Sequence, residues 1–229
     1  MSGVEVAPVR TARERRLFLT FPWRIYSRDP LWVPPLLPER IRSLDPGRGP
    51  FFRRGEAELF LAFLDGRAVG TICAAAERDS NAAGGAPEGL FGFFETIERF
   101  DVAAALLRRA ADWGRSRGLS ALTGPFNLDR ENSYGVLIEG RDRPPALLCG
   151  HTPPYYAPFL ERFGLLPARG DNLAFEFRLD RDSPMMQRTA RLAERIRRKG
   201  WIRLRCADFK LWEREVEVVL ELMNRALAH

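Results

Sequence analysis

The chain has 229 residues, of which 45% are hydrophobic and 29% charged, and its formal net charge is +6. These values are ordinary for a globular protein, so they argue against a disordered chain and a fibrous repeat. The positive charge is compatible with an anionic partner, whether a nucleic acid, an acidic lipid surface or a phosphate-rich cofactor. Many arginines, however, lie in helical stretches beside aspartate and glutamate, and we interpret them as solvated faces.

The N-terminal residues lack a basic start followed by a long apolar run, and nowhere do about 18 apolar residues follow one another. We therefore expect a cytoplasmic protein without a signal peptide or a membrane span. Cys73, Cys149 and Cys206 lie far apart without Cys-x-x-Cys spacing, and the only histidines are His151 and His229. We expect neither a disulfide framework nor a metal site.

Short apolar runs alternate with turn signals in the first half of the chain. Thr11 is a good helix N-cap, and Asp65-Gly66-Arg67 predicts a tight hairpin turn because glycine accepts a positive φ. The patterns predict, in chain order, a strand at 4–9, helices at 11–25 and 36–44, a hairpin of strands at 58–64 and 68–76, and a strand at 89–95.

A long helix opens the second half, with Asp101 as its expected N-cap. The strand before it and the strand after it should be parallel, with a right-handed crossover. The patterns predict, in chain order, a helix at 101–117, a strand at 121–124, a strand or turn at 134–138, a helix at 157–163 ended by Gly164, and a closing strand at 172–179.

The remaining residues predict a basic amphipathic helix at 183–199, a strand at 201–206 and a helix from 211 onward. Glu194 interrupts the basic helix and no aromatic residues interleave it, so we favour a solvated linker helix and do not expect nucleic-acid binding. Apolar residues of the last helix would be exposed, which favours a homodimer. These residues are Val216, Val219, Leu220 and Met223.

This order of elements resembles a GCN5-related N-acetyltransferase (GNAT) domain, and so do two sets of motifs. The family's long helix and a later helix end are matched by Ala105-Leu106-Leu107, Ala111-Asp112-Trp113, Arg117-Gly118-Leu119 and Glu161-Arg162-Phe163-Gly164-Leu165. An uncharacterised bacterial GNAT-like subgroup is matched by Pro50-Phe51-Phe52, Gly92-Phe93-Phe94-Glu95, Gly124-Pro125-Phe126-Asn127 and Thr152-Pro153-Pro154-Tyr155-Tyr156. The resemblance covers about residues 4–180.

The resemblance implies an α/β fold with a GNAT-like mixed central sheet flanked by helices, followed by a C-terminal helix-strand-helix tail. We expect a GNAT-like acyltransferase domain at 1–180. Residues 181–229 would form a linker helix and the start of an incomplete second GNAT-like lobe, as in a truncated or divergent version of a longer protein. The implied function is acyl-CoA-dependent N-acyl transfer to a small-molecule or peptide amine.

The implied cofactor is acetyl-CoA or another acyl-CoA. In the family, amides at a helix N-terminus hold the pyrophosphate, and the matching residues here are 98–103. Glu98 and Asp101 place carboxylates where phosphate would lie. Arg99 is either a phosphate partner or a solvated loop residue. The implied cofactor-binding residues are Phe93, Phe94, Arg99, Val102 and Ala103.

Glu95 ends the apolar strand and is the predicted general base, because a carboxylate beside two phenylalanines would have a raised pKa. The alternative is that Glu95 is an exposed strand end or a cap. Leu160 stands where the family often has a tyrosine that protonates the leaving thiolate. Tyr156 lies about one helical turn earlier and is the predicted catalytic phenol, with a packing role as the alternative. We expect the amine to attack in a cleft between Glu95 and Tyr156.

Asn127 and Asn132 follow a parallel strand, at the end of the sheet where ligands usually bind, and Tyr155 lies beside Tyr156. We predict that these three residues bind substrate, with turn stabilisation as the alternative for the asparagines. His151 is interpreted as a structural hydrogen-bonding residue. Cys149 is interpreted as a buried small hydrophobe.

A second function competes with N-acyl transfer. The two carboxylates in the phosphate-binding loop favour a GNAT-fold protein without catalysis that binds a small ligand or a partner protein. Nucleic-acid binding through the basic tail is a third and weaker hypothesis, which would predict a steep dependence of affinity on salt concentration.

Overall fold

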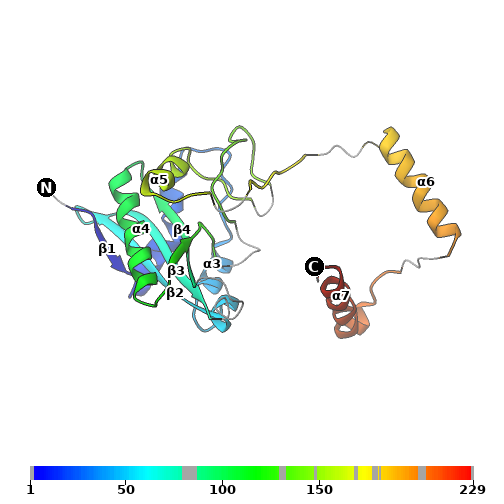
Figure 1. Cartoon of the computed structure of the whole chain (residues 1–229), viewed down its shortest axis with the longest axis horizontal. Helices are drawn as coiled ribbons and strands as arrows, with labels where there is room; N and C mark the ends of the chain where they lie inside the picture. Colours follow the sequence, from blue (N-terminus) through cyan, green and yellow to red (C-terminus); the bar gives the residue numbers. More distant parts are fainter. Residues whose placement is uncertain are drawn as a thin grey trace. The chain divides into compact units, whose positions relative to one another are not determined.

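The computed structural model describes residues 3–78, 87–128, 133–146, 149–167, 170–176, 180, 182–200 and 205–227 (Figure 1). The chain divides into two compact units, Met1–Leu173 and Ala174–His229. The first unit holds the sheet and the helices α1 to α5, whereas the second holds α6 and α7. That the second unit begins a second GNAT-like lobe stays a prediction.

One mixed sheet of five strands forms the centre of the first unit, in the order β1-β2-β3-β4-β5. Neighbours from β1 to β4 are antiparallel, whereas β4 and β5 are parallel and are joined by α4 (Phe100–Arg115). This arrangement confirms the predicted α/β fold with a mixed sheet flanked by helices. The strands are β1 (Glu5–Pro8), β2 (Gly55–Leu64), β3 (Arg67–Glu77), β4 (Glu88–Thr96) and β5 (Ala121–Thr123).

Local signals explain several element boundaries. The β2–β3 hairpin turns at Asp65 and Gly66, whose φ angles of 49° and 73° suit a tight two-residue turn. Thr11 caps α1 (Ala12–Thr20) in a reciprocal arrangement with Glu14, whose amide donates to the Thr11 hydroxyl over 3.2 Å. Both features were predicted from the sequence.

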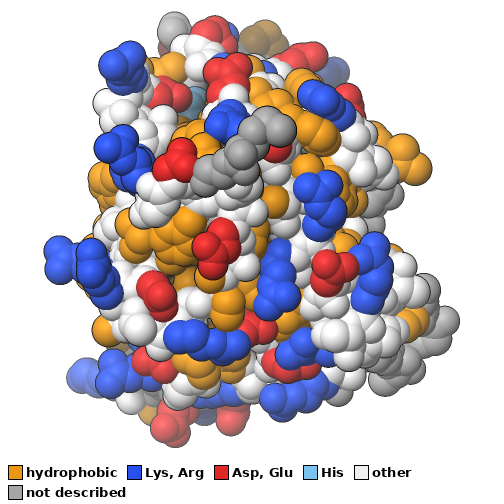
Figure 2. Space-filling model, turned by 90° about the vertical axis from the view of Figure 1, so that its left-hand side faces the viewer, with side chains coloured by type: hydrophobic (Ala, Val, Ile, Leu, Met, Phe, Trp, Pro, Cys, Tyr) orange, Lys and Arg blue, Asp and Glu red, His pale blue; other side chains and the backbone are white. Residues whose placement is uncertain are grey.

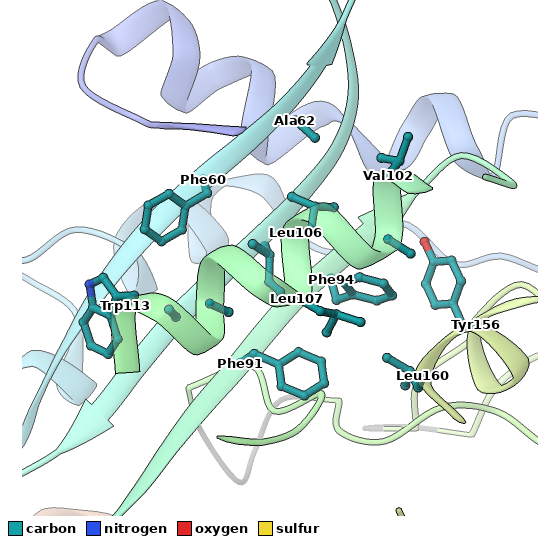
Figure 3. Packing of buried hydrophobic residues seen from close by; sticks show 14 of the residues in the cluster. Phe60, Ala62, Phe91, Phe94, Val102, Leu106, Leu107, Trp113, Tyr156 and Leu160 are labelled. Carbon is teal, nitrogen blue, oxygen red and sulfur yellow. The ribbon is translucent and has the colours of Figure 1, made fainter. Parts of the chain in front are cut away.

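Helices cover both faces of the sheet because its strands are apolar on both sides. On one face, α4 and α5 (Tyr156–Phe163) pack over Phe60, Ile72 and Phe91 (Figure 3). On the other face, Leu59 and Cys73 pack with apolar residues of α1, α2 (Pro22–Ile25) and α3 (Leu37–Ser43). The period of two along each strand assigns neighbouring residues to opposite faces.

A β-bulge interrupts this alternation in β4. Gly92 pairs with Cys73 and Glu95 pairs with Thr71, so two residues of β4, Phe93 and Phe94, oppose one residue of β3. Phe93 has a φ of 47°, and its carbonyl accepts a hydrogen bond of 2.7 Å from the buried Thr71 hydroxyl. Phe93 therefore packs toward α1, whereas Phe94 packs toward α4.

The structure corrects several expected boundaries. Arg99 and not Asp101 is the N-cap of α4, and Asp101 lies in the first turn. Residues 172–176 of the expected closing strand form no strand, and residues 177–179 lie outside the described part. The segment 134–138 contributes only an isolated bridge between Phe126 and Tyr134.

The second unit contains α6 (Pro184–Arg198) and α7 (Trp212–Leu227), close to the expected helices. Ser183 caps α6 by accepting a hydrogen bond from the Met186 amide. Neither helix contains a buried residue. Of the strand expected at 201–206, residues 201–204 lie outside the described part, and the next two residues are irregular.

Among the residues that the structure describes, no helix combines the length and the apolar character needed to cross a membrane. On the face shown in Figure 2, basic side chains are interspersed with acidic ones. The positive net charge is therefore spread over this face and does not form one patch there.

Candidate functional site

A cavity of about 120 Å³ lies beside the β4 bulge. Its lining includes Tyr26, Arg40, Glu95, Cys149, His151 and Tyr156. A second, more open hollow of about 680 Å³ lies between α3 and residues 45–53, but none of the predicted site residues lines it. The smaller cavity is therefore the candidate site.

Glu95 is the centre of a hydrogen-bond network in this cavity. Its Oε2 atom accepts bonds of 3.0 Å from the Tyr26 hydroxyl and 2.8 Å from the Tyr156 hydroxyl. The Tyr156 hydroxyl accepts a bond of 2.9 Å from the Thr96 amide, and the Tyr155 hydroxyl donates to the Thr96 carbonyl over 2.8 Å. Three tyrosines from two distant segments thus fix the end of β4.

Burial raises the pKa of Glu95 to about 7, although hydrogen bonds from Tyr156 and Tyr26 and the charge of Arg40 act in the opposite direction. The carboxyl group can therefore gain or lose a proton near neutral pH. Burial also raises the pKa of Tyr155 to about 12 and raises that of Tyr156 well above its ordinary value. Both phenols stay protonated at neutral pH and act as donors to this network.

The bulge decides where Glu95 lies. If the same sequence paired without a bulge, Phe94 would lie opposite Thr71, and Glu95 would turn toward the face covered by α4. In the observed register, Glu95 reaches Tyr26 at the C-cap of α2, and Arg40 of α3 contributes to its electrostatic environment. Arg40 also lies over the Phe93 ring, with its guanidinium carbon 5.3 Å from the ring centroid.

Asn127 ties the loop after β5 to the bulge. Its Oδ1 atom accepts a hydrogen bond of 2.6 Å from the Phe93 amide, and its Nδ2 donates to the Ser133 hydroxyl over 3.0 Å. The loop approaches β4 closely, because a Cβ atom on Gly92 would lie 2.0 Å from the Phe126 carbonyl oxygen. This packing favours the turn-stabilising alternative for Asn127 while leaving it on the cavity wall.

The expected phosphate-binding amides begin α4 directly after β4. Arg99 donates from Nε to the Asp101 carboxylate over 3.0 Å. That bond and the charge of Arg99 lower the pKa of Asp101, and hydrogen bonds from the backbone amides of Val102 and Asp101 lower it further. Together these effects outweigh burial, which raises the pKa. The Asp101 carboxylate therefore holds amides at the position where the family resemblance would place a phosphate.

The cavity places the Asp29–His151 pair close to this network. His151 Nε2 lies 2.6 Å from Asp29 Oδ2, and only 6% of the His151 side chain is exposed. Tyr26 stacks on Trp32 with ring centroids 4.8 Å apart, and the Tyr26 and His151 rings are 6.3 Å apart. Tyr26, stacked on Trp32, therefore packs near the histidine.

The predicted site residues fall into two groups in the structure. One group surrounds the bulge and comprises Phe93, Phe94, Glu95, Asn127, Tyr155 and Tyr156. The other begins α4, where Arg99 is exposed and Val102 and Ala103 are fully buried. Asn132 lies outside the described residues.

Two expectations about this region are corrected. The direct 2.8 Å hydrogen bond between Tyr156 and Glu95 leaves no room for an amine between them. Cys149 is exposed and lines the cavity. The sequence reasoning also missed Tyr26, Arg40 and Asp29, which no motif marks.

Among the described residues, no cluster of three or more histidine, cysteine, aspartate or glutamate side chains could hold a metal ion. The side chains that line the cavity include one carboxyl group, one imidazole, one guanidinium, one thiol and two phenols.

No protein-family model matches the chain. Over 226 residues it is 34% identical to a bacterial ceramide synthase from Caulobacter vibrioides, covering 98% of this chain and 58% of that protein. Over 214 residues it is 30% identical to protein YghO from Escherichia coli, covering 93% of this chain and 54% of that protein. The chain thus spans little more than half the length of these curated relatives.

Similar solved structures include an aminoglycoside acetyltransferase from a soil metagenomic sample, with a TM-score of 0.45 and 10% identity, over 77% of this chain and 97% of that one. A second is described as an acetyl transferase from Pyrococcus furiosus, with a TM-score of 0.43 and 15% identity, over 77% of this chain and 99% of that one. By sequence, nearly the whole chain is similar to just over half of a bacterial ceramide synthase.

Proposed function

We propose that the chain is part of an acyl-CoA-dependent N-acyltransferase, and that the cavity beside the β4 bulge is its catalytic site. The observation that carries this proposal is Glu95, a carboxyl group with a pKa of about 7 on the wall of a cavity. A carboxylate with such a pKa can accept a proton from an ammonium group near neutral pH.

The similarity to a ceramide synthase supports a particular acceptor. A ceramide is the amide of a fatty acid and a long-chain amino alcohol, so its synthesis is an N-acyl transfer. We propose that the amine here is a long-chain amino alcohol and that the acyl group is longer than acetyl. A cavity of about 120 Å³ suits the amino headgroup, while Trp32, Val33 and Pro35 give its wall an apolar part.

The edge of β4 that faces away from β3 supports binding of the donor's pantetheine arm. The Thr96 amide and carbonyl face away from β3, because they bond to Tyr156 and Tyr155. With the period of two along a strand, the backbone groups of Phe94 face the same side. An extended amide-containing arm could pair with such an edge, as peptides do when they add to a sheet.

In this proposal Glu95 takes the first proton from the ammonium group of the acceptor, and Tyr26 and Tyr156 hold its carboxylate in place. Tyr156 is 1% exposed and its hydroxyl already bonds to Glu95 and Thr96. We therefore propose that Tyr156 acts through Glu95. Arg40 would favour the ionised form of Glu95 and so keep the base available.

Calorimetric titration with palmitoyl-CoA, acetyl-CoA and CoA tests donor binding, and mass spectrometry of reactions with palmitoyl-CoA and sphinganine tests amide formation. We expect saturable donor binding and N-palmitoyl sphinganine with the wild type, and at least about a hundredfold lower turnover with Glu95→Gln. Glu161→Gln, at an exposed position on α5, is the matched control. Donor binding without any amide product would contradict the proposed acceptor.

A second candidate is a binding module without catalysis, and the start of α4 favours it. The Asp101 carboxylate already occupies amides that a pyrophosphate would need, and Arg99 neutralises that carboxylate. The double variant Glu98→Gln/Asp101→Gly separates the two candidates. If the wild type does not bind CoA but the double variant does, the result would support the binding module.

A further inference from the structure

His151 has one ring nitrogen that the hydrogen-bond network leaves unused. Nε2 is paired with Asp29, whereas Nδ1 is buried and has no hydrogen-bond partner. A histidine that only stabilises the fold would normally satisfy both nitrogens, because an unpaired buried polar atom costs stability. The side chain also lines the candidate cavity, so Nδ1 is the one buried imidazole nitrogen there without a protein partner among the described residues.

Asp29 fixes the form of this imidazole. Burial raises the pKa of Asp29, but hydrogen bonds from His151 and from the Leu31 and Trp32 amides outweigh that effect and lower it overall. An ionised carboxylate can only accept a hydrogen bond, so Nε2 carries a proton. In the neutral ring, Nδ1 then keeps its lone pair and can act as a base.

The histidine and Glu95 belong to one site. Both line the cavity, and Tyr26 connects them, since its hydroxyl donates to Glu95 and its ring packs near the His151 ring. Glu95 already accepts two phenolic hydrogen bonds. An acyl transfer from a thioester to an ammonium group must move two protons, so a second acid or base, either a residue or water, has to handle the second proton.

Leu160 occupies the position at which the family resemblance would place an acid for the leaving sulfur. Leu160 is 7% exposed and packs in the hydrophobic core with Tyr156 (Figure 3). A leucine cannot donate a proton. The acid must therefore come from another residue of the cavity or from water.

We infer that His151 is the second acid–base group of the reaction, with Asp29 as its positioning residue. This inference rests on the proposed N-acyl transfer. Glu95 takes one proton from the ammonium group, and the resulting amine attacks the thioester carbonyl to form the N–C bond. His151 Nδ1 takes a second proton from the attacking nitrogen as the C–S bond breaks, and the imidazolium then protonates the leaving thiolate.

In total, one ammonium group and one thioester give one amide, one thiol and one proton. Glu95 passes that proton to water. Asp29 stabilises the imidazolium that exists between the two transfers. The other titratable groups that line the cavity are Tyr26, Arg40, Glu95, Cys149 and Tyr156. Any dependence of the rate on pH reflects these groups as well as His151.

The test compares the wild-type chain with His151→Gln and Asp29→Asn, using palmitoyl-CoA and sphinganine as probes. We expect His151→Gln to lower kcat by roughly 10²- to 10⁴-fold while palmitoyl-CoA binding by calorimetry stays within about threefold. Asp29→Asn should lower kcat at least about tenfold. His229→Gln is the control, because it removes the chain's other histidine.

Nitrogen-15 NMR of the imidazole gives a measurement that does not depend on turnover. In the His229→Gln background a single histidine remains, and we expect the tautomer with a proton on Nε2 and none on Nδ1 at pH 8.

The opposite tautomer, or a His151→Gln rate within about threefold of the wild type, would overturn the assignment of His151 while leaving the proposed transfer intact. A wild type that binds palmitoyl-CoA but makes no amide would instead overturn the proposed function, and the inference would fall with it. Equal loss of binding, folding and rate in His151→Gln would show a purely structural histidine.

Discussion

Replacing Glu95 by glutamine should make the protein more stable at alkaline pH and less active. A folded-state pKa of about 7, against 4.5 for the free side chain, means that the fold resists ionisation of this group. The difference corresponds to roughly 3 kcal/mol, at about 1.36 kcal/mol per pKa unit. Glutamine keeps the size and one acceptor oxygen while removing the charge.

The sign of the pH dependence follows from proton binding. Between pH 4.5 and about 7 the folded state holds a proton that the unfolded state has lost, so the contribution of Glu95 to stability falls as the pH rises through that window. Above about pH 7 the loss is complete. The gain from Glu95→Gln should therefore be near zero at pH 4.5 and reach its maximum, up to roughly 3 kcal/mol, at pH 8.

Urea unfolding of both proteins at several pH values between 4.5 and 8.5 measures this difference, with Glu161→Gln as the control for a surface charge change. Altered hydrogen bonding to Tyr26 and Tyr156 would subtract a constant amount of about 1 kcal/mol at all pH values. A difference between wild type and Glu95→Gln that does not change with pH would refute the reasoning, because it would show that Glu95 ionises as easily in the fold as in the unfolded chain.

Three further expectations concern the frame around Glu95. Asn127→Ala should destabilise the protein by about 1–3 kcal/mol in urea unfolding, because the Phe93 amide loses its acceptor. An unchanged free energy of unfolding would show that water replaces the asparagine oxygen as the acceptor. Gly92→Ala should abolish soluble folded protein or lower its Tm sharply, because the new Cβ would meet a backbone oxygen at 2.0 Å. Gly170→Ala is the control and should leave the Tm unchanged, because open space surrounds Gly170. Tyr156→Phe should raise the pKa of Glu95, since it removes a hydrogen bond that lowers it, and an unchanged Glu95 carboxyl titration by carbon-13 NMR would contradict this.

The fold could be predicted largely because its signals are local. The hairpin turn at Asp65 and Gly66, the N-cap at Thr11 and the helix end at Gly164 each depend on residues next to one another in the sequence. The expected closing strand at 172–179 failed because alternation of apolar residues does not provide a partner strand, and residues 172–176 have none.

The site could be predicted only in part, for a related reason. Glu95 was recognised because it ends an apolar strand, yet its partner Tyr26 is 69 residues away in sequence. Arg40 likewise comes from a helix that only the packed fold brings to β4, and Asp29 comes from a turn that it brings to His151. The bulge gave no signal either, since Gly92-Phe93-Phe94-Glu95 is a continuous apolar run apart from its last residue.

The bulge in β4 lets the number of residues in one strand change without moving the site. Deleting either Phe93 or Phe94 would leave one residue opposite Ile72 and keep Glu95 opposite Thr71, so the strand would pair regularly and Glu95 would keep its face. The cost would be one phenylalanine lost from the core. A single-codon deletion at the bulge should therefore be tolerated better than one elsewhere in β4, where every side chain on one side of the deletion would turn to the opposite face.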